Sequence, residues 1–160
     1  RPPSACTTSE TVPANSLSKC DMSHLLNEFA GTVSDVVHAD GGRIVKFIGD
    51  EVMWVSSAPE RLARAAVDLV EHPKAREEGL QVRAGLAYGT VVAINGDYFG
   101  NPVNLAARLV AAAAPEQILA TSELRDELPD WPAVAQGPLT LKGFNAPITA
   151  FDLHAGTLPS

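Results

Sequence analysis

The apolar positions of this chain alternate between a helical and a strand-like spacing. After a polar opening stretch, apolar residues recur every three or four positions from about Asp21 to a pair of glycines, which predicts an amphipathic helix of about four turns. The same spacing over residues 60–72 predicts a second helix. A third helix is predicted over residues 101–114, where Asn101 would be the N-cap and Pro102 would occupy the first helical position.

Short runs that are rich in β-branched and aromatic residues lie between these helices. Residues 43–56 predict a β-hairpin with a tight turn at the glycine that precedes Asp50. Residues 81–96 and 117–121 are further strand candidates, and residues 139–153 predict two strands around an Asn-Ala-Pro turn. Because helices alternate with strands and hairpins, we expect an α+β or α/β sandwich in which helices cover a sheet.

The N-terminal stretch has a different composition from the rest of the chain. Residues 1–20 are rich in Ser, Thr and Pro and have almost no apolar periodicity. Such a composition buries too little surface to offset the entropy of ordering the chain. We therefore expect a flexible, disordered tail over residues 1–20 and a single folded domain over residues 21–155.

Composition narrows the classes of function. The chain has 160 residues, 46% of them hydrophobic, and a formal net charge of −7, which argues against binding to nucleic acids or membrane surfaces. A few lysines and arginines could still form a pocket for a small anion. No apolar run approaches the roughly 20 residues of a membrane-spanning helix. Cys6 and Cys20 form neither a zinc motif nor a disulfide framework, so we expect a cytoplasmic protein without a membrane segment.

Two charged residues are notable in the predicted hairpin. Strand alternation places Ile44, Lys46 and Ile48 on one face, so a lysine lies in the middle of an apolar strand. Asp50 follows at the turn. When these two residues are considered alone, a lysine that protects an edge strand and an ordinary turn aspartate are the simpler explanation.

The third predicted helix also contains unusual polar residues. Asn104 and Arg108 are four positions apart and therefore lie on one helix face, among apolar neighbours and without an acidic partner within one turn. The planar guanidinium of arginine suits phosphate groups, although a solvated helix face explains the pattern equally well. Asp97, in a loop rich in glycine and asparagine, and Lys142, at a strand end, are unremarkable individually.

Taken together, three segments resemble the catalytic domain of class III adenylate and guanylate cyclases. The metal-binding hairpin of that family is matched by GGRIVKFIGDEVMWV, its nucleotide and transition-state segment by VRAGLAYGTVVAINGDYFGNPVNLAARL, and its closing hairpin by LTLKGFNAPITAFDL. The segments have the order and spacing of the family, and the match runs from about Asp21 to His154. The resemblance implies a ferredoxin-like α+β sandwich, with a sheet covered by helices.

The resemblance also implies a role for each matching residue. Asp50 corresponds to one of two aspartates that hold a pair of divalent metal ions, Mg²⁺ or Mn²⁺. Lys46 and Asp97 correspond to the pair that recognises the purine. A lysine donates to a ring nitrogen of adenine and an aspartate accepts from its 6-amino group, whereas guanine presents the opposite pattern. The pair therefore implies ATP as the substrate.

Three further matches imply contacts with the ribose and the phosphates. Asn104 corresponds to the residue that orients the ribose, Arg108 to the one that stabilises charge on the α-phosphate, and Lys142 to the one that holds the terminal phosphates. The implied reaction is attack of the ribose 3′-hydroxyl on the α-phosphate, which gives 3′,5′-cyclic AMP and pyrophosphate. In this family the site forms between two domains, which implies a head-to-tail homodimer or a heterodimer with another cyclase domain.

The N-terminal segment departs from the family pattern. A typical member begins with a strand of the form Phe-x-Asp-hydrophobic-x-Gly-Phe-Thr, which supplies the other metal aspartate, but ACTTSETVPANSLSKC has neither an aspartate nor an apolar strand. We therefore expect that the first strand is missing, as in a truncated or frameshifted gene product. Adenylate cyclase activity of this chain alone should then be weak or absent. The alternative is a non-catalytic pseudo-cyclase that pairs with an intact cyclase as a dimerisation or regulatory partner.

Overall fold

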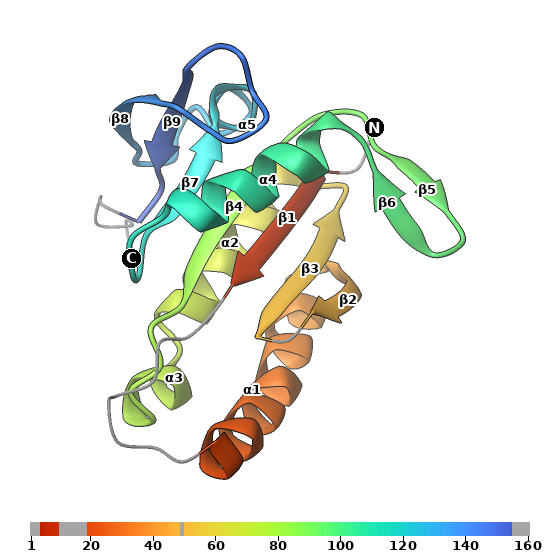
Figure 1. Ribbon diagram of the computed structural model, residues 1–160, viewed down its shortest axis with the longest axis vertical. Helices are drawn as coiled ribbons and strands as arrows, with labels where there is room; N and C mark the ends of the chain where they lie inside the picture. The colour runs from red at the N-terminus through yellow and green to blue at the C-terminus, as the bar shows by residue number, and fades with distance from the viewer. Residues whose placement is uncertain (1–3, 10–18, 49, 155–160) are drawn as a thin grey trace.

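The computed structural model describes residues 4–9, 19–48 and 50–154. The helices are α1 (Lys19–Ala39), α2 (Pro59–Val70), α3 (Pro73–Glu77), α4 (Asn101–Ala112) and α5 (Ser122–Asp126). The strands are β1 (Ser4–Ser9), β2 (Arg43–Ile48), β3 (Glu51–Ser56), β4 (Arg83–Ala87), β5 (Val92–Ile94), β6 (Asp97–Phe99), β7 (Ile118–Thr121), β8 (Val134–Leu139) and β9 (Ile148–Asp152). Figure 1 shows how they are arranged.

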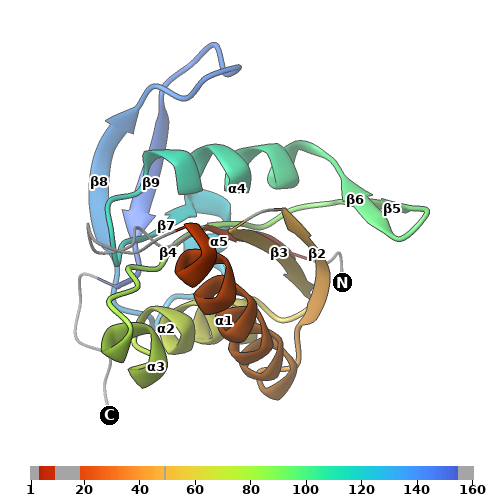
Figure 2. The same cartoon turned by 60° about the horizontal axis from the view of Figure 1, so that its bottom comes forward.

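One large sheet separates two groups of helices. Its seven strands run in the order β2-β3-β1-β4-β7-β9-β8, and β5 and β6 form a separate two-stranded sheet. All neighbouring strands are antiparallel except β4 and β7, which are parallel. Helices α1 and α2 lie on one side of the large sheet, and α4 lies on the other (Figure 2). This arrangement confirms the predicted α+β sandwich of a sheet covered by helices.

The prediction that the first strand is missing is wrong. Residues Ser4–Ser9 form β1, which pairs with β3 from Ser4↔Ser56 to Ser9↔Glu51 and with β4 from Ala5↔Ala87 to Ser9↔Arg83. They are therefore a strand in the interior of the sheet and not part of a flexible tail, while residues 1–3 and 10–18 lie outside the described residues. The polar composition is misleading because an interior strand gains backbone hydrogen bonds from both neighbours, whatever its side chains.

The main hydrophobic core fills the space between the sheet and α1 and α2. The apolar side of α2 is completely buried in this core, which confirms the amphipathic helix predicted there. The largest side chains with less than 2% of their surface exposed include Trp54 of β3, Leu62 and Leu69 of α2, and Leu86 of β4. Helix α1 contributes Phe29, Val33 and Val37 to the same core.

A glycine allows α4 to pack closely on the other face of the sheet. A Cβ atom at Gly85 of β4 would lie 2.3 Å from the carbonyl oxygen of Ala106 and 2.6 Å from the backbone nitrogen of Val110. Real Cβ atoms do not approach backbone atoms this closely, so only glycine fits at this crossing. The contact fixes α4, and with it the polar residues along its exposed side.

Two local predictions need correction. The N-cap of α4 is Gly100 and not Asn101: Gly100 has φ 140°, a conformation that L side chains rarely adopt, and Asn101 is already helical. The first of the two C-terminal strands, β8, ends at Leu139, earlier in the chain than predicted, and the segment 140–147 joins it to β9. Alternation alone did not indicate β8 because most of its side chains are exposed.

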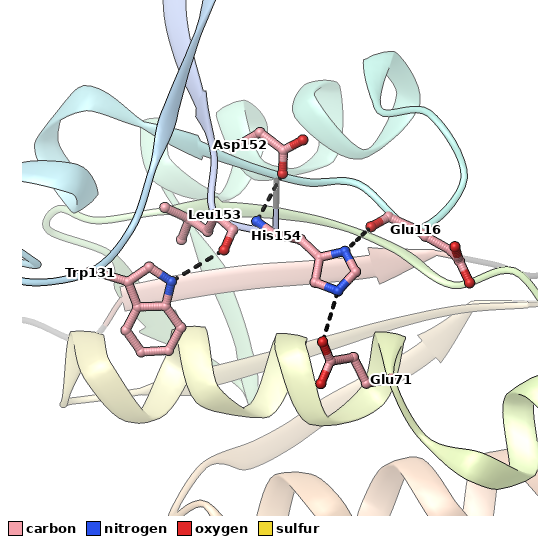
Figure 3. A network of polar contacts seen from close by, with 6 residues as sticks. All are labelled: Glu71, Glu116, Trp131, Asp152, Leu153 and His154. Atoms are coloured by element: carbon pink, nitrogen blue, oxygen red, sulfur yellow. Dashed lines mark hydrogen bonds and ion pairs between the residues drawn. The ribbon is translucent and has the colours of Figure 1, made fainter. Parts of the chain in front are cut away.

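The end of β9 is attached to α2 and to the neighbouring loops by hydrogen bonds (Figure 3). The Nδ1 atom of His154 lies 2.7 Å from the carbonyl oxygen of Glu116, and its Nε2 atom lies 3.1 Å from a carboxylate oxygen of Glu71. Both neighbouring oxygens are hydrogen-bond acceptors, so each ring nitrogen makes its hydrogen bond where it carries a proton. The indole N–H of Trp131 donates to the carbonyl oxygen of Leu153 at 3.3 Å. None of the described helices is long and apolar enough to cross a membrane.

Candidate active site

A β-bulge in β2 turns Lys46 toward the α4 side of the sheet. The register pairs Ile44 with Trp54 but Lys46 with Met53, so Val45 is the extra residue. The predicted alternation, with Ile44 and Lys46 on one face, is therefore wrong. Ile44 packs into the main core, whereas Lys46 lies on the opposite face. A bulge of this kind redirects a side chain, and no period-two pattern can indicate it.

The β5–β6 hairpin brings Asp97 to the same place. Its turn residues Asn95 and Gly96 have φ values of 51° and 80°, as a type I′ turn requires. The hairpin packs against the rest of the domain through a small apolar cluster in which Val91 and Tyr98 meet side chains of β2, β3 and α4. Asp97 is thus the first residue of a strand, where the sequence alone indicated a loop.

Lys46 and Asp97 form an ion pair. The Lys46 ammonium donates to Oδ2 of Asp97 at 2.8 Å, and the backbone N–H of Tyr98 donates to Oδ1 at 2.8 Å. These hydrogen bonds, that from Lys46 first, hold the pKa of Asp97 below its ordinary value. The two side chains are 41% and 32% exposed, so an incoming ligand can reach both the cation and the carboxylate.

The exposed side of α4 contains two more of the predicted residues. Asn104 and Arg108 are both exposed, one helical turn apart, and Val103 packs in the same apolar cluster as Tyr98. Within the described part of the chain, Arg108 has no ion-pair or hydrogen-bond partner. A guanidinium in this state is available for an anionic ligand.

Lys142 lies in the segment between β8 and β9, on the α4 side of the sheet. The preceding residue, Leu141, is 4% exposed and belongs to an apolar cluster with Leu109 of α4, and Phe144 packs against the same cluster. These contacts hold the segment beside the helix, while Lys142 itself is exposed. Figure 2 shows the β8–β9 segment rising on the same side of the sheet as α4.

The candidate metal residues lie at the turn between β2 and β3. Asp50 is exposed, and Glu51 follows it at the start of β3. Partial burial, and then the Asp50 carboxylate, raise the pKa of Glu51. The end of β1 lies next to this turn because Ser9 pairs with Glu51, yet β1 contains no carboxylate. Among the described residues, no three histidine, cysteine, aspartate or glutamate side chains gather into one group.

The structure therefore brings Lys46 and Asp97 into contact and places Asn104, Arg108 and Lys142 on the same side of the sheet. It also adds two residues that the sequence reasoning missed. Arg43 donates a hydrogen bond to the hydroxyl of Tyr98, and its guanidinium carbon lies 5.2 Å from the centre of that ring. The Asn-Gly pair just before Asp97 is a strong hairpin signal and could have indicated this strand.

The fold and these segments agree with one family. Residues 11–155 match the model of the adenylate and guanylate cyclase catalytic domain, and the chain belongs to this family. It is 73% identical over 144 residues to an uncharacterized protein of Mycobacterium tuberculosis, Rv2212, a match that covers 90% of this chain and 38% of that protein. It is 38% identical over 108 residues to an adenylate cyclase of Streptomyces coelicolor, over 68% of this chain and 28% of that enzyme.

The chain spans less than half of the length of these relatives. Among solved structures, it resembles the crystal structure of the adenylyl cyclase CyaB from P. aeruginosa, with a TM-score of 0.79 and 22% identity. That match covers 94% of this chain and 93% of CyaB. At this level of identity the likeness shows the fold.

Proposed function

We propose that this domain is of the adenylate cyclase type and converts ATP to 3′,5′-cyclic AMP and pyrophosphate. The observation that supports the proposal most directly is the Lys46–Asp97 pair, because it presents a donor and an acceptor side by side at 2.8 Å. Adenine offers an acceptor at its ring nitrogen and a donor at its amino group, on neighbouring atoms of one edge. Guanine reverses this pattern, so the pair favours ATP over GTP.

The other residues on the α4 side suit the rest of the nucleotide. The amide of Asn104 can hold a ribose oxygen, and the Arg108 guanidinium one turn away can stabilise negative charge that develops on the α-phosphate. Lys142, in the segment that packs beside α4, can neutralise the terminal phosphates. Together they would orient the 3′-hydroxyl for attack, and phosphoryl transfer depends largely on such positioning.

The residues that would bind the divalent metal ions are incomplete in this chain. The family resemblance assigns divalent metal ions, Mg²⁺ or Mn²⁺, to Asp50 and to a second aspartate at the first strand. The sequence of β1, SACTTS, contains no aspartate or glutamate, the residue types that best hold such ions. We therefore propose that cyclase activity of the chain alone is strongly impaired.

We also propose a head-to-tail dimer. Among the residues whose exposure the structure describes, the exposed large apolar ones lie, with the exception of Val134, on the β2–β3 and β5–β6 hairpins: Phe47, Ile48, Val92, Ile94 and Phe99. Two adjacent hairpins with such side chains form an apolar surface of the kind that protein interfaces cover. In a dimer built through this surface, Asp50 of one protomer could serve the nucleotide held by the other.

The test is formation of cyclic AMP from ATP and Mn²⁺ by the purified chain, before and after a family-type first strand with its aspartate is introduced. We expect little product from the original chain and a rise of at least about 100-fold after the change, because a lost metal ligand removes several kcal/mol of transition-state stabilisation. In the restored chain, Asp97→Ala should lower kcat/KM for ATP, whereas Asp126→Ala, at an exposed position of α5, should not. Substantial activity of the original chain that Asp50→Ala abolishes would refute the impairment.

A second function deserves the same test because β1 lacks a carboxylate. A chain that has all of the nucleotide-binding residues but lacks one of the metal-binding aspartates could act as the partner of an intact cyclase. Mixing it with an Asp97→Ala variant of a restored chain would then produce cyclic AMP, since each protomer supplies what the other lacks. Failure of the mixture, in spite of demonstrated dimer formation, would exclude this role.

A further inference from the structure

The β5–β6 hairpin is attached to the domain by side chains. Among the described strands, β5 and β6 pair only with each other, so no backbone ladder joins them to the large sheet. The hairpin extends away from the body of the domain in both Figure 1 and Figure 2. The position of Asp97, the first residue of β6, therefore depends on the side chains that hold the hairpin in place.

Two polar contacts join β2 to β6 in the described part of the chain. One is the ion pair of Lys46 with Asp97. The other is the contact of Arg43 with Tyr98, in which the guanidinium both donates to the hydroxyl and lies 5.2 Å from the ring centre. The ring of Tyr98 also packs in the apolar cluster that contains Val45 and Val103. Arg43 thus holds the residue that directly follows Asp97.

For recognition of a base, the distance between Lys46 and Asp97 matters more than the attraction between their charges. A base that is read by both must meet Nζ of Lys46 and Oδ2 of Asp97 with neighbouring atoms of one edge. If the hairpin moved away from β2, either contact could form but not both. When a base binds to Lys46 and Asp97, its hydrogen bonds replace the ion pair between them. The contact of Arg43 with Tyr98 then remains as the polar link between β2 and β6.

We propose that Arg43 and Tyr98 are positioning residues for nucleotide selectivity. Their contact keeps the hairpin at the distance from β2 at which an adenine edge fits both Lys46 and Asp97. The inference rests on the proposed use of ATP, and it assigns a specific role to two residues that would not touch the nucleotide.

Conservative substitutions separate this role from simple packing. Tyr98→Phe keeps the ring in the apolar cluster and removes only the hydroxyl. Arg43→Met keeps an apolar stem of similar length and removes the guanidinium, while Arg43→Lys keeps a cation and a donor. Arg76→Met, at an exposed arginine of α3, is the matched control for loss of a surface charge.

The experiment is calorimetric titration of each variant with ATP and with GTP, alongside thermal unfolding. We expect Tyr98→Phe and Arg43→Met each to reduce the ratio of ATP to GTP affinity about 3- to 10-fold, the effect of losing one hydrogen bond. The double variant should lose no more than Arg43→Met alone, because that variant already removes both the hydrogen bond and the contact with the ring. Arg43→Lys should retain most of the preference, and Arg76→Met all of it. An unchanged ratio, or losses that add in the double variant, would overturn the proposal.

This readout is independent of catalysis. If the chain forms no cyclic AMP but prefers ATP, and the variants reduce that preference, the cyclase proposal fails while the positioning role stands. If the unmodified chain binds ATP and GTP equally, the proposed substrate fails. Hydrogen exchange of the Asp97–Phe99 amides then decides the remaining point: faster exchange in Tyr98→Phe supports the link to β2, and unchanged exchange refutes it.

Discussion

Replacing Gly85 with alanine should push α4 away from the large sheet. The added methyl group would lie 2.3 Å from the carbonyl oxygen of Ala106, 2.6 Å from the backbone nitrogen of Val110 and 2.9 Å from the Cγ2 atom of that valine. Two of these three atoms belong to the backbone of the helix. They cannot rotate out of the way as a side chain could, so the helix itself must move.

The size of the effect follows from two opposing contributions. Overpacking in a well-packed core costs about 1–3 kcal/mol. Alanine also restricts the unfolded chain more than glycine does, which returns about 0.4–1 kcal/mol. We expect a net loss of about 1–2 kcal/mol in the free energy of unfolding, which in a domain of this size lowers Tm by about 2–8 °C.

Urea unfolding followed by circular dichroism measures this loss. Gly137→Ala is the matched control, because a Cβ atom at this exposed glycine of β8 would meet nothing within 4 Å. Since α4 contains Asn104 and Arg108, Gly85→Ala should also lower the kcat of a chain in which β1 is given the family-type aspartate. A Gly85→Ala variant that is as stable as the parent would show that α4 does not press on β4 in solution.

Three other predictions concern single side chains. In a chain in which β1 is given the family-type aspartate, Arg108→Lys should lower kcat about 10- to 100-fold with little change in KM, because the proposed role of the planar guanidinium is in the transition state. Steady-state kinetics with equal effects on both constants would contradict this role. Partial burial and Asp68 raise the pKa of Asp40 to about 6. The associated stability is fully present below the unfolded pKa of 3.8 and is lost as pH rises through 6. Asp40→Asn should therefore be more stable than the parent by about 1 kcal/mol at about pH 8, after allowance for solvent screening, and equally stable at about pH 3. His154→Ala should reduce stability by about 0.5–1.5 kcal/mol through loss of the contact with Glu71 and its second hydrogen bond; thermal melting that is unchanged would mean that the network of Figure 3 contributes nothing.

The sequence predicted the parts of the fold in which burial imposes a period. Helix α2 is the clearest example, because its apolar side faces a continuous core. The hairpin at Asp50 was also predictable, since a tight turn separates two β-rich runs. Strand β1 was not predictable, because its place in the sheet depends on backbone pairing with β3 and β4, which are distant from it in the chain.

The candidate site was predictable as a set of residue types but not as a geometry. The resemblance identified Lys46 and Asp97, but a bulge at Val45 and an Asn-Gly turn bring them together. Neither feature follows from alternation of apolar and polar residues. Tyr98 and Arg43 were missed for a related reason: their significance lies in a contact between two strands, and neither residue is unusual where it stands.

The place of β1 has a consequence for how the domain folds. The first described strand is the link between β2-β3 on one side and β4-β7-β9-β8 on the other, and its partners lie as far along the chain as Ala87. Pairings between such distant residues close large loops and are slow to form. During synthesis, β1 therefore leaves the ribosome before β3 and β4, and both of its edges are paired only after β4 has followed. The two halves of the sheet can gather their own helices before then, and insertion of β1 between them would be a late step in folding.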